Sequence, residues 1–402
     1  MHPLIYDWNT VDPVAAPAGP VMLDDETLRD GLQSPSVRTP GIEQKLRILH
    51  LIDRLGIDTA DIGLPGAGPH VVRDVERLAR EIGGATLTVR ANCAARTVIA
   101  DIQPIADVVQ RTGVPIEACT FIGSSPIRQY AEDWTLDRLQ RLTEEAVTFA
   151  VAQGLDVMYV TEDTTRADPD SLRALYSTAI RAGAKRLCIA DTVGHATPAG
   201  AAAVVRFVRT IVDDCGGGVG IDWHGHRDRD LAIENSLAAM RAGATRLHGA
   251  AIGIGERVGN TPMDVLLVNL VLMGVRTSDL SALCEYCAVV SEATGVPIPA
   301  NYPVVGRDAY RTATGVHAAA VIKAFRKNDP ALVDCVYSGV PARLVGREQT
   351  IDVGPMSGKS NVVYWLEKRG LEATEERVDR IFTAAKQSGS VLTEQEIRAL
   401  LD

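Results

Sequence analysis

The chain of 402 residues has few aromatic side chains and no long apolar run. Phe, Trp and Tyr together make up 4% of it, and no hydrophobic stretch approaches the ~20 residues of a membrane span. The first twenty residues have neither the basic nor the apolar segment of a secretory signal. The seven cysteines are an odd number and are scattered, which disfavours a disulfide framework. These absences predict a globular cytoplasmic protein without a membrane partner.

An excess of basic residues is also missing. Lys and Arg number 41 against 51 Asp and Glu, which gives a formal net charge of −10. An acidic chain is a poor match for nucleic acid or for an anionic membrane, so we expect neither as a partner. An anionic substrate would therefore need local positive charge or a metal ion at its site.

What the sequence does contain is a regular alternation of short β-rich segments and longer helical ones. This alternation predicts a parallel sheet, and eight units over about 250 residues predict a (β/α)8 TIM barrel. A doubly wound open sheet is the alternative, because periodicity alone does not show closure. Asp168-Pro169 and Thr197-Pro198 each place a capping residue before a first-turn proline. The expected strands are 21–25, 59–64, 86–92, 116–123, 155–162, 186–191, 219–224 and 245–253.

The alternation stops near residue 276, and the chain continues with helical segments and a stretch punctuated by Pro and Gly. We therefore predict an N-terminal extension over residues 1–19, a catalytic TIM barrel over 20–280 and C-terminal helical subdomains over 281–402. The last part is too short for a large independent domain. It is expected to be a mainly helical appendage to the barrel.

Polar residues gather where the predicted strands end, which is where active sites of such barrels are built. The strongest local feature is the pair His224 and His226, because residues two apart on a strand face the same side. Asp30, after the first strand, could complete a set of two histidines and one carboxylate around a metal ion. The alternative is that both histidines are surface loop residues and that Asp30 caps a helix.

Five segments together resemble a known family. LDDETLRDGLQSP, HGH, GIGERVGN, TGVHAAAVIK and SGKSNV occur in that order. The chain resembles, over residues 20–366, the metal-dependent TIM-barrel family of 2-isopropylmalate, homocitrate and citramalate synthases, whose relatives include the 3-hydroxy-3-methylglutaryl-CoA lyases. The resemblance implies an acyltransferase that condenses acetyl-CoA with a 2-oxo acid to a 2-substituted malate and free CoA.

The resemblance also implies roles for individual residues. The metal, which could be magnesium, manganese, cobalt or zinc, would be bound by Asp30, His224 and His226, with Asn260 close to it. Thr192 would hold the carboxylate of the 2-oxo acid, and Arg29 the oxygen that becomes negative. The remaining positions it implies are Glu162 and Glu256 near the reacting groups, His317 and Tyr337 for acid–base chemistry, and Gln33, Met158 and Val160 against the substrate. The family also implies a homodimer in which His317 acts on the partner subunit.

Some positions depart from the family. Leu32 stands where the synthases have Glu, as in the lyases, and Arg227 follows the histidine pair. Met158 stands where homocitrate synthases have an arginine for the far carboxylate of 2-oxoglutarate. We therefore expect an uncharged 2-oxo acid, unless Arg90, Arg96 or Arg227 supplies the charge. The leucine-feedback domain of many isopropylmalate synthases would follow residue 402 and is expected to be absent.

Two other functions are kept as alternatives. One is cleavage of a C–C bond in the manner of 3-hydroxy-3-methylglutaryl-CoA lyase. The lyases have a glycine-rich, cysteine-containing loop after the eighth strand, whereas GIGERVGN at that place has no cysteine. The other is a metal-dependent binding or scaffold protein that has lost turnover, although every candidate ligand and acid–base residue is present.

Overall fold

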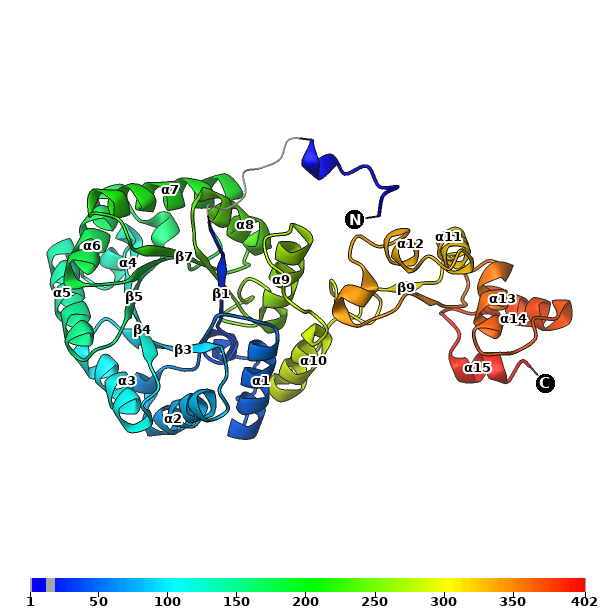
Figure 1. Ribbon diagram of the computed structural model, residues 1–402, viewed down its shortest axis with the longest axis horizontal. Helices are drawn as coiled ribbons and strands as arrows, with labels where there is room; N and C mark the ends of the chain where they lie inside the picture. The colour runs from blue at the N-terminus through cyan, green and yellow to red at the C-terminus, as the bar shows by residue number, and fades with distance from the viewer. Residues whose placement is uncertain (1, 12–18, 402) are drawn as a thin grey trace. The chain divides into compact units, whose positions relative to one another are not determined.

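The computed structural model describes residues 2–11 and 19–401. Eight parallel strands form a closed barrel in chain order, and Figure 1 shows the ring of strands surrounded by helices. This confirms the TIM barrel. The strands are β1 (Met22–Asp25), β2 (Thr59–Asp61), β3 (Arg90–Arg96), β4 (Ile116–Gly123), β5 (Val157–Glu162), β6 (Arg186–Asp191), β7 (Gly220–Gly225) and β8 (Arg246–Gly249).

Closure is made by β1 and β8, which pair in parallel with Asp24 opposite His248. The alternative of an open doubly wound sheet is therefore wrong. Figure 1 shows helices on the outside of the ring. The helices of this part of the chain are α1 (Ile42–Arg54), α2 (Pro69–Gly84), α3 (Ile99–Thr112), α4 (Pro126–Ala131), α5 (Leu136–Ala152), α6 (Pro169–Ala182), α7 (Pro198–Asp214), α8 (Ala232–Ala242), α9 (Met263–Leu272) and α10 (Leu283–Thr294).

Two helix starts follow the capping prediction. The side chain of Asp168 accepts a hydrogen bond from the backbone N–H of Ser171, with Pro169 as the first residue of α6. Thr197 accepts from the N–H of Gly200 in the same way at the start of α7. Each cap satisfies one N–H that has no partner within the helix.

The expected third strand, residues 86–92, was misplaced. Thr88 lies before the strand, where its N–H and hydroxyl both donate to Asp53 Oδ1, at 2.6 and 2.8 Å. The strand that forms is Arg90–Arg96, whose five central residues are all buried. Burial of residues 91–95 determines where the strand forms. The β-branched residues before the strand form a turn instead, in which the side chain of Asp53 holds Thr88.

The barrel interior carries ionic as well as apolar residues. Arg246 is 1% exposed, and its guanidinium donates to Asp222 at 2.5 Å and to Glu117 at 2.6 Å. Its Nη2 also lies 3.1 Å from the sulfur of Met158. Buried charges are tolerated when they are paired in this way.

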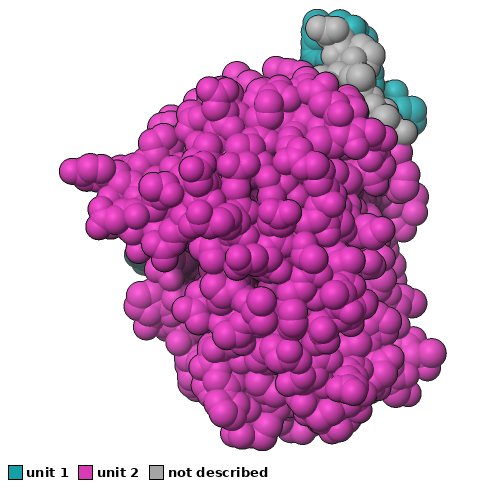
Figure 2. All heavy atoms as spheres, turned by 90° about the vertical axis from the view of Figure 1, so that its left-hand side faces the viewer, with its two compact units in different colours: residues 1–12, 280–284, 298–402 teal, residues 13–279, 285–297 magenta. Residues whose placement is uncertain are grey.

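The chain divides into two compact units, coloured separately in Figure 2. The barrel unit comprises residues 13–279 and 285–297, and the second unit comprises residues 1–12, 280–284 and 298–402. The second unit contains a two-stranded pair and five helices among its described residues. These are β9 (Arg311–Thr312), β10 (Thr350–Ile351), α11 (Gly315–Arg326), α12 (Pro330–Cys335), α13 (Lys359–Glu367), α14 (Glu375–Gln387) and α15 (Glu394–Arg398). This region is mainly helical, as expected.

Part of the expected N-terminal extension lies outside the described residues, namely residue 1 and residues 12–18. All seven cysteines are free thiols. Among the described residues, none of the helices combines the length and the apolar character that crossing a membrane requires.

Candidate active site

A cavity of about 340 Å³ lies in the barrel unit, and the ends of several strands line it. Most of the site residues expected from the sequence meet there. The expected residues that line it are Arg29, Asp30, Gln33, Met158, Val160, Glu162, Thr192, His224, His226 and Glu256. Asn260 lies next to the cavity, because its side chain bonds to the lining residue Asp30. The barrel thus brings together ten residues from five separate stretches of the sequence.

The two histidines and Asp30 form a compact group of potential metal ligands. One donor atom of each residue lies within 4.8 Å of the others, and all three side chains are buried. His224 belongs to β7, and His226 follows it in an isolated bridge with Asn260. Asn260 Nδ2 donates to Asp30 Oδ1 at 2.6 Å. The expected carboxylate and both imidazoles therefore converge on one point.

Two atoms of this group are buried without a hydrogen-bond partner among the described residues. They are Nδ1 of His226 and Oδ1 of Asn260. Buried polar atoms are usually satisfied in folded proteins, and these two lie beside the carboxylate and imidazole donors, which fits a bound ion at this group. Nitrogen and oxygen donors of this kind suit a divalent cation such as magnesium, manganese, cobalt or zinc. The residues fit the metal that the sequence predicts.

The charges around the group favour metal-binding protonation states. Burial and the neighbouring His224 lower the pKa of His226 to about 4, so its imidazole is neutral near pH 7. Burial opposes ionisation of Asp30, but Arg29 and then His224 hold the pKa of that carboxyl below its ordinary value. A neutral imidazole and an ionised carboxylate are the forms that bind metals.

Arg29 is surrounded by carboxylates. Its guanidinium lies 2.6 Å from Asp61, 2.8 Å from Asp30 and 3.1 Å from Glu26. These charges raise its pKa well above the ordinary value although burial acts against this. Burial raises the pKa of Asp61 to about 7. The arginine is thus held rigidly at the edge of the cavity as a permanent cation.

Thr192 and Glu162 stand at neighbouring strand ends. The hydroxyl oxygen of Thr192 accepts a hydrogen bond of 2.8 Å from the backbone N–H of Asp163, which leaves its proton available to a ligand. Burial raises the pKa of Glu162, and Arg128, whose Nη2 is 3.8 Å from it, acts in the opposite direction. Both residues line the cavity.

The side of the cavity formed by β5 is apolar. Met158 packs with Cys119 and Cys188, and Val160 packs against this cluster. None of the three arginines considered as a source of charge is among the described residues that line the cavity. Arg90 lies 4.0 Å from the sulfur of Met22, Arg96 pairs with Asp101 at 2.7 Å, and Arg227 lies 3.4 Å from Asp230.

His317 and Tyr337 belong to the second unit, where their ring centroids lie 4.4 Å apart at an interplanar angle of 30°. His317 is on α11 and is exposed, and Tyr337 is 45% exposed. The two expected acid–base residues are therefore neighbours of each other.

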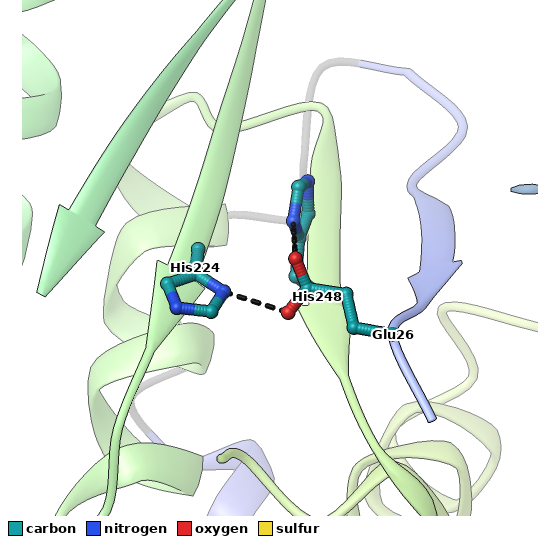
Figure 3. A group of neighbouring side chains, drawn as sticks. All are labelled: Glu26, His224 and His248. Carbon is teal, nitrogen blue, oxygen red and sulfur yellow. Dashed lines mark hydrogen bonds and ion pairs between the residues drawn. The ribbon is translucent and has the colours of Figure 1, made fainter. Parts of the chain in front are cut away.

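The sequence analysis missed Glu26 and His248. The carboxylate of Glu26 accepts from Nδ1 of His224 at 2.7 Å and from Nδ1 of His248 at 3.1 Å. Figure 3 shows this carboxylate between the two rings. The alternation on β8, where His248 stands two residues after Arg246, could have placed His248 in the interior. Glu26 gave no such signal because it follows the last residue of β1.

The chain is similar in sequence to several known proteins. Residues 21–290 match the model of the HMGL-like family. The chain is 35% identical to the homocitrate synthase AksA of Methanopyrus kandleri over 378 residues, which cover 92% of this chain and 88% of that protein. It is 30% identical to the 2-isopropylmalate synthase of Pyrococcus furiosus over 390 residues, 95% of this chain and 75% of that protein.

A solved structure shows a similar fold. The HMG-CoA lyase of Bacillus subtilis superposes with a TM-score of 0.60 at 19% identity, covering 71% of this chain and 98% of that one. At this identity the similarity shows the fold alone. The relatives at 30–35% identity are named as synthases, with three different products among their names: 2-isopropylmalate, homocitrate and citramalate.

Proposed function

We propose, from the premise that the chain belongs to the HMGL-like family and is an enzyme of its synthase group, that it condenses acetyl-CoA with an uncharged 2-oxo acid. Water would hydrolyse the thioester once the C–C bond has formed, so the products would be a 2-substituted malate and free CoA. The observation that carries the proposal is the group Asp30, His224 and His226 with its unsatisfied polar atoms, set beside Arg29 in one cavity. A cytoplasmic location belongs to the proposal and accords with seven free thiols.

Different residues of the cavity bind different groups of the 2-oxo acid. A divalent metal ion held by Asp30, His224 and His226 would supply the Lewis acidity that polarises the ketone. The Thr192 hydroxyl donates a hydrogen bond to the substrate carboxylate. Arg29, a permanent cation beside the metal group, stabilises the oxygen that gains negative charge as the C–C bond forms. Such preorganised donors cost little reorganisation during the reaction.

The acetyl group needs a base, because its methyl group must lose a proton before the carbon attacks the ketone. We assign this proton transfer to His317, with Tyr337 next to it. Since His317 is exposed on its own unit, we propose a homodimer in which His317 of the partner subunit serves each cavity. Glu162 and Glu256, which line the cavity, lie near the reacting groups in this proposal.

The lining supports an uncharged substrate side chain. Among the described lining residues the arginines are Arg29 and Arg257, and no lysine is present. Arg29 is already paired with three carboxylates, and Arg257 contacts Asp228 at 2.8 Å and the carbonyl of Thr192 at 2.6 Å. A second substrate carboxylate against the apolar β5 side would be unpaired, which costs several kcal/mol. A methyl or isopropyl group there gains roughly 1–3 kcal/mol instead.

The test is the release of free thiol from acetyl-CoA with pyruvate, 2-oxoisovalerate and 2-oxoglutarate, each with added Mn²⁺. We expect thiol release, with the highest kcat/KM for one of the two uncharged acids. The highest value for 2-oxoglutarate would contradict the substrate assignment. Cleavage of 3-hydroxy-3-methylglutaryl-CoA without any thiol release would indicate a lyase, and inactivity in both assays would indicate a binding protein.

A further inference from the structure

We propose that Glu26 is a positioning residue, which holds the ring of His224 in the tautomer that binds metal and anchors Arg29 to the same carboxylate. This inference rests on the proposed function, because it takes His224 as a metal ligand. It adds a residue that lies outside the ligand set and outside the substrate contacts. It also links the metal group to the arginine that faces the substrate.

Both carboxylate oxygens of Glu26 are engaged by donors. Oε2 accepts from Nδ1 of His224 at 2.7 Å. Oε1 accepts from Nδ1 of His248 at 3.1 Å and from Nη2 of Arg29, also at 3.1 Å. Glu26 is 3% exposed, and Figure 3 shows its carboxylate reaching both rings. The side chain therefore has one conformation that satisfies three partners.

The contact with His224 determines where the lone pair of that imidazole lies. A carboxylate only accepts hydrogen bonds, so Nδ1 of His224 must carry the proton. The lone pair is then on Nε2, the other ring nitrogen, which becomes the metal-binding atom. A carboxylate behind a ligating histidine fixes the tautomer and the ring orientation and raises the basicity of the ligand.

A second cation site made by Glu26, His224 and His248 is the competing interpretation, because their donor atoms also lie within 4.8 Å of one another. Both nitrogens of His248 are already occupied, however. Nε2 lies 3.0 Å from Asp222 Oδ2, and Nδ1 faces Glu26. With the ring 1% exposed, His248 has no lone pair to offer a metal and instead holds Glu26 in place.

The variant Glu26→Gln tests whether the carboxylate of Glu26 sets the tautomer of His224. His248 and Arg29 both donate to the same oxygen of Glu26, so the glutamine carbonyl must face them. Its NH₂ group then faces Nδ1 of His224 and can only donate to it. This arrangement moves the proton of His224 to Nε2, where it blocks the metal. The amide thus reverses the tautomer while the size of the side chain is unchanged.

Asp61→Asn is the matched control. Asp61 is a buried carboxyl that also contacts Arg29, at 2.6 Å, and its other hydrogen bond comes from the backbone N–H of Gly63 and not from His224. We expect Mn²⁺ titration, followed by the EPR signal of the free ion, to give a dissociation constant about 10–100-fold higher for Glu26→Gln than for the unaltered protein. Asp61→Asn should stay within about threefold of it.

The tautomer itself is measured by ¹⁵N NMR of the metal-free protein labelled at histidine, near pH 8. The His224 signal, identified by its loss in His224→Gln, should show a protonated Nδ1 in the unaltered protein and in Asp61→Asn. It should show a protonated Nε2 in Glu26→Gln. A merely structural role of Glu26 would not change the tautomer of a folded variant.

The outcomes are distinguishable. Equal Mn²⁺ affinity of Glu26→Gln and Asp61→Asn, or a protonated Nε2 in the unaltered protein, would overturn the inference about Glu26. The tautomer of the unaltered protein is measured without Glu26→Gln and therefore decides the case even if that variant does not fold. Failure of the proposed metal group is a separate result, in which the unaltered protein and His226→Ala bind Mn²⁺ alike or not at all.

Discussion

At the scale of single residues, the site is a balance of buried charges. Arg29 touches three carboxylates, and one of them, Glu26, also bonds to His224 and His248. Arg29 and His224 hold the pKa of Asp30 below its ordinary value, although burial acts against this, and His224 and His248 do the same for Glu26. At Asp61 burial outweighs the effect of Arg29 and raises the pKa to about 7. Asp25 is the opposite case to Asp30, because its neighbours carry no positive charge and burial dominates the pKa of its carboxyl. Burial raises the pKa of its carboxyl to about 7, and its partners are Tyr286 and Thr27.

The raised pKa of Asp25 predicts that the free energy of unfolding depends on pH. Its pKa is higher in the folded chain than in the unfolded one, so the folded state binds more protons between about pH 4 and 7. The free energy of unfolding should fall as pH rises through this range, by at most about 1.4 kcal/mol per pH unit from this group. In Asp25→Asn this contribution should be absent, since the amide can accept from Thr27 N–H and donate to the Tyr286 hydroxyl.

The measurement is urea unfolding of both proteins between pH 5 and 6.5. Groups that titrate in both proteins cancel in the difference between the two unfolding free energies. This difference should therefore shift steadily in favour of Asp25→Asn as pH rises. Two curves that stay parallel over the range would show that Asp25 is ionised throughout.

At the scale of elements, the alternation of side chains along each strand explains what could be predicted. Residues two apart on β5 and β7 share a face, and this rule placed Met158, Val160 and both histidines in the cavity. The partners of Glu26 could not be predicted in this way. His248 is 222 residues away and reaches it through the pairing of β1 with β8, which only closure of the barrel establishes.

The alternation on β5 predicts a change of specificity. Val160→Leu adds one methylene to the apolar side of the cavity, which is worth about 1–3 kcal/mol when the space is needed by the substrate. We expect kcat/KM for 2-oxoisovalerate to fall about tenfold or more relative to pyruvate.

Tyr159→Phe is the control, because Tyr159 is the next residue on β5 and its hydroxyl bonds to Thr143 at 2.7 Å instead of facing the cavity. It should cost about 1 kcal/mol of stability and leave the ratio of the two specificity constants unchanged. An unaltered ratio in Val160→Leu would show that the substrate side chain does not contact β5.

At the scale of the whole molecule, the residues of the proposed active site come from two compact units. The barrel unit contains the group Asp30, His224 and His226 and the cavity beside it, whereas His317 and Tyr337 belong to the other unit. The sequence predicted the mainly helical character of the second unit. It could not predict from periodicity which cavity the exposed His317 serves, because that depends on assembly.

The proposed homodimer predicts complementation between inactive variants. His317→Ala should lack the base and His224→Ala the metal ligand, so each homodimer should be inactive. Mixed dimers contain one cavity with an intact barrel and an intact partner residue. After joint unfolding and refolding at equal amounts, about a quarter of the normal thiol release should return, as expected for random pairing of two subunits. No recovery in refolded dimers, or full activity of a monomer, would contradict action in trans.

The most direct test of the central claim is thiol release from acetyl-CoA before and after removal of divalent metal. The claim is that Asp30, His224 and His226 hold a metal on which the condensation depends. With its preferred 2-oxo acid, the chelated protein should be inactive, and Mn²⁺ should restore turnover at micromolar to millimolar concentration. His226→Ala should stay folded and fail to recover. Full activity of the metal-free protein, or normal recovery of His226→Ala, would contradict the account.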